Sequence, residues 1–320
     1  MASLNGWSFN PFPAFAPTLY PNTAFYNVTN PSKNLTYQIQ LSWPLTWNSS
    51  TSSVSNKTAL TMYVLDGNAL GTTAAEAVKR RAPLEVTQPD SVVVSIGYPL
   101  TDNVYALTQR GIDFRPPIPS PAPTTPRAGA DDFLAFITGT VRPWVRDSVF
   151  PSVKFTRDAL YGHSFGGLFV VYALLQKPLG FDTFLAASPS LFWEGGRMLG
   201  MVTDALGDGN SNGTTPLPSP PGLSTSGNYP LPAVVISYGS VEQFPVRRRR
   251  ETEAAFQARK RSIMVRFNNS MTVNCHDLYD RIKGSGNKVR EVILKEYAGQ
   301  EHSSVAASAI TDGFEYFIDW

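Results

Sequence analysis

The stretch Tyr161-Gly162-His163-Ser164-Phe165-Gly166-Gly167-Leu168 decides the fold of this chain. An apolar, strand-like run at 158–161 leads into it, and an apolar run with helical character follows at 168–175. A strand that turns this sharply into a helix strains its central residue and holds that side chain out of the turn, at the positive end of the helix dipole. In this setting the Gly-x-Ser-x-Gly spacing predicts a nucleophile elbow, with Ser164 as the nucleophile.

The glycines beside the serine belong to the same prediction. We expect Gly162 and Gly166 to be required, because a Cβ atom at either position would clash in so tight a turn. The alternative is a chance match in a surface loop, and the flanking strand-like and helix-like runs disfavour it.

Composition narrows the class of protein. The 320 residues are 42% hydrophobic and 16% charged, which is typical of a globular chain, and the single cysteine excludes an internal disulfide. The net charge of +2 does not suggest a nucleic-acid or membrane-surface partner. The N-terminus lacks the pattern of a secretory signal, and no apolar run approaches the ~20 residues that span a bilayer. We therefore expect a cytoplasmic protein; the sequence carries no signal for an oligomeric state.

Strand-like and helix-like segments alternate along the chain. Strands are expected at 36–43, 59–65, 91–96, 158–161, 183–187, 233–238 and 289–297. Helices are expected at about 72–81, 130–148, 166–176, 246–266, 270–284 and 303–318. This repeat predicts an α/β fold with a mostly parallel central sheet flanked by helices on both faces. The early strands precede the repeat and could add antiparallel pairs at one edge.

Two stretches interrupt the alternation. Residues 115–127 contain six prolines and are expected to form a loop. Residues 207–232 are rich in Gly, Ser, Asn and Pro, which indicates a low-complexity insertion between core elements. We expect residues 1–320 to form one domain that carries this loop and this insertion.

A serine hydroxyl needs a base to remove its proton, and the chain offers three histidines. His163 precedes the serine in the turn, so its side chain should point away from it. His276 adjoins Cys275, but too few ligands surround it for a metal site, and none is expected. His302 follows the last expected strand, which is where an α/β-hydrolase carries its base. The alternative for His302 is a capping or solvent-exposed loop residue.

The acid that orients the imidazole should follow a strand between the serine and the histidine. Glu242, after the expected strand at 233–238, occupies that place. It could instead be an exposed glutamate that neutralises nearby arginines. Asp204, Asp277 and Glu301 compete with it, and a Ser–His dyad without an acid stays open.

The tetrahedral intermediate needs backbone N–H donors. Phe165, directly after the nucleophile, is the first candidate. Gly67 and Asn68, which end the expected strand at 59–65, are candidates for the second donor. An ordinary Asp-Gly turn at the same place is the alternative.

Five segments together carry a resemblance to a known family. They are Tyr-Val-Leu-Asp-Gly-Asn at 63–68, Gly-His-Ser-Phe-Gly-Gly-Leu at 162–168, Ala-Ala-Ser-Pro-Ser-Leu-Phe-Trp at 186–193, Gly-Ser-Val-Glu at 239–242 and Glu-His-Ser-Ser-Val at 301–305. Over residues 35–318 the chain resembles the esterase-D-like esterases of the α/β-hydrolase fold. It is most similar to the siderophore esterases, which include bacterial enterobactin and salmochelin esterases and fungal enzymes that open triacetylfusarinine C.

The resemblance implies a serine esterase that hydrolyses a ferric siderophore inside the cell and so releases iron. It places Ser164, His302 and Glu242 at the family's nucleophile, base and acid positions. It implies no cofactor, because any iron would arrive with the substrate. General carboxylesterase and acyltransferase activities on the same fold are alternatives that the sequence does not separate.

Two further residues are expected near the substrate. Residues 109–117 resemble the Arg-x-x-Asp segment of the siderophore esterases, with Arg110 and Asp113 at the matching places. The resemblance implies that Arg110 and Trp193 line the cleft. A solvated loop arginine is the alternative for Arg110.

One basic segment stands apart from this catalytic pattern. Eight basic residues at 246–267 oppose only Glu251 and Glu253. They could be a solvated helix flank, or they could attract an anionic substrate, an effect that would be weak for the nearly neutral ferric triacetylfusarinine C. They could also bind nucleic acid, in which case the chain would be a non-catalytic binding protein on a hydrolase scaffold.

Overall fold

The computed structural model describes residues 2–4, 7–9, 21–47, 54, 57–100, 102–119, 121–122, 124–176, 180–207, 231–267, 270–286 and 288–319. Most of the insertion expected at 207–232 lies outside these residues. In the described part of the Pro-rich stretch 115–127, no helix or strand forms, as expected.

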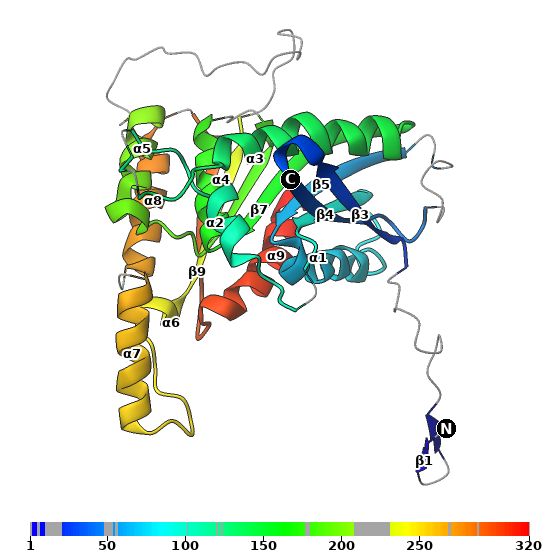
Figure 1. Ribbon diagram of the computed structural model, residues 1–320. Coiled ribbons are helices and arrows are strands. Elements are labelled where there is room, and N and C mark those ends of the chain that lie inside the picture. Colours follow the sequence, from blue (N-terminus) through cyan, green and yellow to red (C-terminus); the bar gives the residue numbers. More distant parts are fainter. Residues whose placement is uncertain are drawn as a thin grey trace.

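Eight strands form a central sheet in the order β10-β9-β8-β7-β5-β6-β4-β3 (Figure 1). They are β3 (Thr23–Asn30), β4 (Leu35–Ser42), β5 (Lys57–Leu65), β6 (Ser91–Gly97), β7 (Val153–His163), β8 (Thr183–Ala187), β9 (Ala233–Gly239) and β10 (Glu291–Tyr297). The β3–β4 and β4–β6 pairs are antiparallel and the other pairs are parallel. The expected mostly parallel sheet with antiparallel strands at one edge is therefore confirmed. Strands β1 (Ala2–Leu4) and β2 (Trp7–Phe9) pair separately.

Helices connect these strands. They are α1 (Gly67–Arg81), α2 (Leu107–Asp113), α3 (Ala130–Phe136), α4 (Phe165–Gln176), α5 (Arg197–Leu206), α6 (Ser240–Gln243), α7 (Glu253–Phe267), α8 (Met271–Gly284) and α9 (His302–Asp319). Short helical turns are η1 (Pro31–Lys33), η3 (Ile137–Val141), η4 (Trp144–Val149) and η6 (Trp193–Gly196). The helix expected at 130–148 is present, although η3 and η4 give it π-helical turns.

The sheet buries an apolar layer on each face, as the near-continuous apolar runs of its inner strands require. On one face, α1 and α9 pack against residues such as Met62 and Tyr161. On the other face, α3, α4, α5 and α8 pack against residues such as Tyr63 and Leu160 (Figure 1). Helix α4 is buried along its length because it lies between the sheet and α5.

The helix expected at 246–266 is wrong in its first turns. Residues 246–252 are not helical, and α7 begins at Glu253. Arg247 and Arg250, three residues apart, would be like-charged neighbours on a helix, which disfavours a helix there. Thr252 then caps the helix, because its Oγ1 accepts a hydrogen bond of 3.2 Å from the Ala255 N–H. Helix α7 projects away from the sheet, with α6 at its base (Figure 1).

Candidate active site

Ser164 lies in the turn between β7 and α4, at the carboxyl end of a central strand. Its φ angle of 60° is the strained left-handed conformation expected of an elbow residue. A Cβ on Gly162 would lie 2.3 Å from the Gly166 carbonyl oxygen, so this glycine is required. The expectation for Gly166 is wrong, because a Cβ there would meet no atom closer than 3.6 Å. Gly167 is the second crowded position, since a Cβ there would lie 2.8 Å from the Ala187 carbonyl oxygen.

The candidate acid and base follow neighbouring strands of the sheet and lie at the same edge as Ser164. Glu242 follows β9 and His302 follows β10, and the carboxyl ends of parallel strands meet at one edge. His302 Nε2 lies 2.9 Å from Ser164 Oγ, and His302 Nδ1 lies 2.5 Å from Glu242 Oε2. The three side chains thus form a hydrogen-bonded chain in the order acid, base, nucleophile.

Glu242 is held firmly in place. It is 5% exposed, and its Oε1 accepts hydrogen bonds of 2.6 Å from both Ser188 Oγ and the Gly239 N–H. A Cβ on Gly239 would lie 2.1 Å from the Gln300 carbonyl oxygen, so only glycine allows the acid-bearing and base-bearing loops to approach this closely. A carboxylate with one oxygen fixed by two donors presents the other oxygen to the imidazole in a defined direction.

Two of the competing acids have other partners, and the third lies on another helix. Asp277 binds Arg281 at 2.6 Å, and Glu301 binds Arg248. Asp204 lies on α5, whose neighbour is α8. The geometry therefore favours Glu242 over these three, and it favours a triad over a dyad.

His163 packs beside the triad. Its ring centroid lies 4.5 Å from that of His302, and the side chain is 5% exposed. Burial, together with the neighbouring His302, lowers the pKa of His163 well below its usual value, so it stays neutral. A neutral ring supports the His302 imidazole without adding a charge that would oppose its protonation.

The expected N–H donors lie at two helix N-termini that meet beside Ser164. Phe165 opens α4, and Gly67 and Asn68 open α1. A Cβ on Gly166 would lie 3.6 Å from Asp66 Oδ2, which shows how closely the two helix starts approach. The first N–H groups of a helix have no partner within it and point toward an incoming anion.

A hydrogen-bonded network fixes the short loop at Asp66, after which α1 begins with Gly67 and Asn68. Arg110 Nε and Nη2 each donate a 2.8 Å hydrogen bond to Asp66, whose φ of 54° is left-handed. The Asn68 amide bonds the backbone N–H and carbonyl of Tyr98, both at 2.7 Å. The Tyr98 hydroxyl donates to Asp113, on the same short helix α2 as Arg110. The two charged residues of the Arg-x-x-Asp segment therefore brace this loop from two sides.

The hydroxyl groups of this network were not singled out from the sequence. Tyr37 and Tyr98 each donate to Asp113 at 3.0 Å, and Gln109 donates at 2.9 Å. Burial nevertheless raises the pKa of Asp113 to about 6. Only the strand order that brings β4 beside β6 places these tyrosines together.

The cleft over Ser164 has a volume of about 420 Å³. Its lining includes the two histidines His163 and His302 and the three arginines Arg110, Arg248 and Arg259. Trp193 is absent from its described lining and borders a neighbouring cavity instead.

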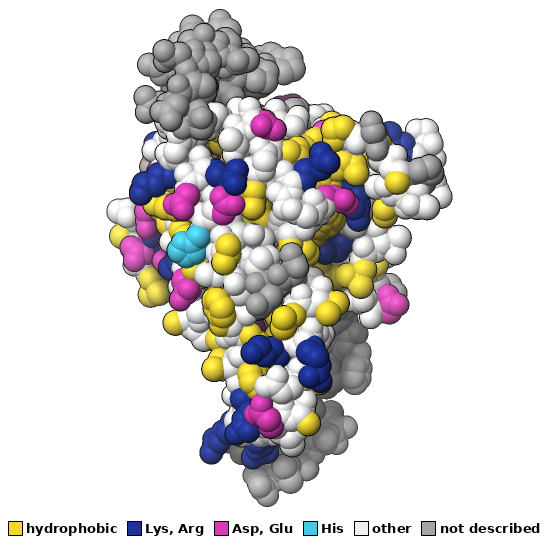
Figure 2. Space-filling view, turned by 90° about the vertical axis from the view of Figure 1, so that its left-hand side faces the viewer, with side chains coloured by type: hydrophobic (Ala, Val, Ile, Leu, Met, Phe, Trp, Pro, Cys, Tyr) yellow, Lys and Arg dark blue, Asp and Glu magenta, His cyan; other side chains and the backbone are white. Residues whose placement is uncertain are grey.

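The basic segment forms one wall of this cleft. Arg248 pairs with Glu301, and Arg259 pairs with Glu251 at 2.8 Å. In the view of Figure 2, Lys and Arg side chains gather at the lower end of the molecule, where α7 lies in Figure 1. Because its cleft-lining arginines are neutralised by glutamates, the wall offers less attraction to an anion than its composition suggests.

The model of the Putative esterase family matches residues 32–282. The chain belongs to this family. It is 39% identical over 320 residues to the siderophore enterobactin esterase of Emericella nidulans, covering 97% of both chains. It is 34% identical over 305 residues to the siderophore triacetylfusarinine C esterase of Aspergillus fumigatus, covering 95% of this chain and 96% of the relative.

A solved structure agrees with this family assignment. The siderophore hydrolase EstA from Aspergillus nidulans matches with a TM-score of 0.80 at 36% identity, and the match covers 98% of each chain. The α/β-hydrolase fold expected from the sequence is thereby confirmed for this Putative esterase family member.

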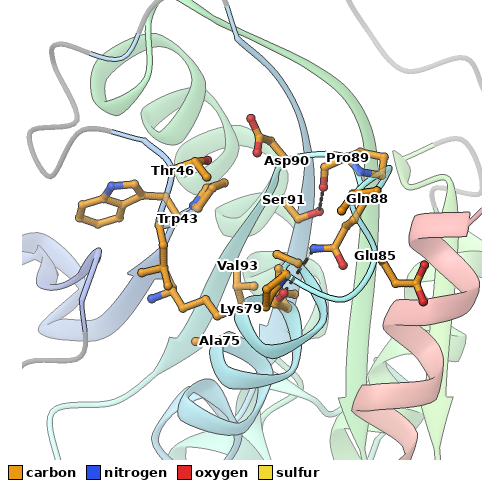
Figure 3. A pocket seen from close by; sticks show the side chains of 17 residues that line it. Trp43, Thr46, Ala75, Lys79, Glu85, Gln88, Pro89, Asp90, Ser91 and Val93 are labelled. Atoms are coloured by element: carbon orange, nitrogen blue, oxygen red, sulfur yellow. Dashed lines mark hydrogen bonds between the residues drawn. The ribbon is translucent and has the colours of Figure 1, made fainter.

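The esterase has another, separate hollow of about 370 Å³ between α1, the residues that follow β4 and the segment that leads into β6 (Figure 3). Trp43, Lys79 and Pro89 are among its lining residues, and it shares none with the cleft over Ser164. Partial burial lowers the pKa of Lys79 to about 8, but its amine already donates to Thr23 Oγ1 at 3.1 Å. We therefore place the chemistry of the esterase in the cleft.

In the part of this protein that the structure describes, there is neither a metal-binding cluster nor a helix that could span a membrane. The described residues contain no group of three or more His, Cys, Asp or Glu side chains that could hold a metal ion. None of the helices that they form combines the length and apolarity needed to cross a bilayer.

Proposed function

We propose that this protein is a siderophore esterase, a serine carboxylic ester hydrolase that acts inside the cell on a ferric siderophore of the triacetylfusarinine C type. The observation that carries the proposal is the Ser164–His302–Glu242 chain, with contacts of 2.9 and 2.5 Å, in a protein 34–39% identical to two siderophore esterases over nearly its whole length.

In the proposed reaction, Ser164 Oγ attacks the ester carbonyl carbon while His302 Nε2 takes the hydroxyl proton. Glu242 fixes the imidazole through Nδ1 and balances the positive charge that the ring gains. The N–H groups of Phe165 and of Gly67 or Asn68 stabilise the oxyanion of the tetrahedral intermediate.

Collapse of that intermediate breaks the ester C–O bond, and the proton on His302 passes to the departing alkoxide. Water then attacks the acyl-enzyme with His302 again as the base, and a second collapse releases the acid and restores the Ser164 hydroxyl. This chemistry needs no cofactor. Ring opening removes the preorganisation of a cyclic chelator, which weakens its hold on the iron that it brings.

The test is hydrolysis of ferric and iron-free triacetylfusarinine C and of ferric enterobactin, followed by mass spectrometry, with Ser164→Ala as the control. We expect ring-opened products that disappear in the variant. Cleavage of a simple aryl acetate without turnover of any siderophore would point to a general carboxylesterase. Transfer of the acyl group to an added alcohol in preference to water would point to an acyltransferase.

A further inference from the structure

A cavity of about 370 Å³ lies beside the cleft, between the Pro-rich loop and η6. Its lining includes Pro116, Pro117 and Ile118 on the loop side and Trp193 with Glu194 on the η6 side. The proposed reaction assigns no role to it. Its walls are mostly apolar, with two arginines, Arg115 and Arg127, and Arg127 pairs with Asp132 at 2.9 Å.

Backbone hydrogen bonds tie this cavity to the nucleophile. The Trp193 N–H donates to the Ser190 carbonyl at 3.1 Å, and the Ser190 N–H donates to the Ser164 carbonyl at 3.0 Å. The Arg115 guanidinium lies 5.7 Å from the ring centroid of Phe165, the residue after the nucleophile. Through these contacts the cavity lies close to the turn that holds Ser164.

Trp193 carries an unused hydrogen-bond donor. Its side chain is 7% exposed, and its indole Nε1–H is buried without an acceptor in the part of the chain that the structure describes. Buried donors are nearly always paired, because leaving one without an acceptor is unfavourable. An acceptor atom on a bound ligand would satisfy this group.

The backbone around η6 is strained in a way that is typical of functional sites. Glu194 has a φ of 48°, and Gly195 and Gly196 follow at 68° and 88°. Left-handed backbone is unfavourable for glutamate, and such residues concentrate where a ligand is held. In this conformation the Glu194 carboxylate lies 3.7 Å from Arg115, so the positive charge of Arg115 is compensated.

We propose that this cavity is a subsite for an uncharged, largely apolar arm of the substrate, whose carbonyl-type oxygen accepts a hydrogen bond from Trp193 Nε1. The inference rests on the proposed esterase function and deepens it. Apolar walls favour an apolar arm, and because Arg115 pairs with Glu194 and Arg127 pairs with Asp132, an anionic arm gains no advantage. Between the substrates named for the two relatives, the subsite therefore favours neutral hydroxamate arms over anionic catecholate arms.

The first test is Trp193→Phe, which keeps an aromatic ring and removes the donor. We expect kcat/KM for ferric triacetylfusarinine C to fall about three- to tenfold relative to kcat/KM for a short aryl acetate, mainly through KM, as for one lost hydrogen bond. Arg197→Gln is the matched control, because Arg197 is exposed on the adjacent α5 and lies outside the described lining. An unchanged ratio of the two kcat/KM values in folded Trp193→Phe would overturn the proposal.

The second test is Glu194→Gln, at a side chain that is 38% exposed, so the fold should tolerate it. Removing the compensating charge should improve kcat/KM for ferric enterobactin relative to ferric triacetylfusarinine C by about three- to tenfold. No change in that ratio would contradict the charge argument.

A separate pair of substrates distinguishes failure of the subsite from failure of the proposed function. Wild-type protein that cleaves aryl acetate but neither siderophore would sink the siderophore assignment alone. Two aryl esters, whose acyl arms end in a neutral N-methyl amide or in a carboxylate, then test the subsite directly. A preference for the amide that Trp193→Phe removes would support the subsite, and equal cleavage of both esters would reject it.

Discussion

Arg110 donates two hydrogen bonds of 2.8 Å to Asp66, from Nε to Oδ1 and from Nη2 to Oδ2. The Asp66 side chain is 1% exposed and that of Arg110 is 12% exposed. Burial raises the pKa of Asp66, and the guanidinium opposes this rise by favouring the charged carboxylate. Because Asp66 precedes Gly67 and has left-handed backbone, the pair sets the direction of the candidate oxyanion donors.

Arg110→Lys should lower kcat about 10- to 100-fold and change KM less, because lysine keeps the charge but cannot hold the carboxylate at two points. Steady-state kinetics on an aryl acetate measures the effect. Arg80→Lys is the control, since Arg80 pairs with Glu76 at the surface. A rise in KM for a siderophore at constant kcat would instead assign Arg110 to substrate binding.

Glu242→Ala should lower kcat at least tenfold, and Glu242→Gln should behave similarly, because each removes the charge that holds and stabilises the His302 imidazole. Glu301→Ala, at a neighbouring acid that binds Arg248, is the matched control and should stay within about threefold of wild type. Should Glu242→Ala cost less than tenfold, about 1.4 kcal/mol of barrier, the acid is elsewhere or is not needed.

The glycines of the elbow should differ in their tolerance of a methyl group. Gly162→Ala and Gly167→Ala should each reduce the free energy of unfolding by about 1–3 kcal/mol, because the new Cβ would lie within 3.0 Å of backbone atoms. Gly166→Ala should cost less than about 1 kcal/mol, since it meets only ordinary contacts. Urea unfolding compares the three variants, and equal losses would contradict this crowding pattern.

Asp113 should make stability depend on pH in an unusual direction. Its folded pKa of about 6 lies above the ordinary value of 3.8, so the stabilisation is present at low pH and is lost as pH rises through about 6. The free energy of unfolding of wild type, minus that of Asp113→Asn, should therefore grow by at most about 3 kcal/mol from pH 8 to pH 4. Urea unfolding at the two pH values measures it, and a difference that shrinks toward low pH would refute the assignment.

Most of the sheet and its covering helices could be predicted from the sequence, because apolar periodicity reports which segments are buried. Strand β3 was not predicted, since its pattern is largely polar at the sheet edge. Helix α2 was not predicted either, because a seven-residue helix has little intrinsic stability and depends on the contacts of Arg110 and Asp113. Helix α5 was also not predicted, although it is amphipathic. It begins directly after the two glycines at 195–196.

By itself, the sequence determined the elbow at Ser164, the alternation of strands and helices, and the places of His302 and Glu242 after their strands. These are local properties, which neighbouring residues specify through backbone preference and apolar spacing. Only the tertiary structure decided that residues 60 and 138 positions apart meet as one hydrogen-bonded chain. It also decided that Arg110 braces Asp66 and that Trp193 borders its own cavity, because strand order and helix packing bring distant segments together.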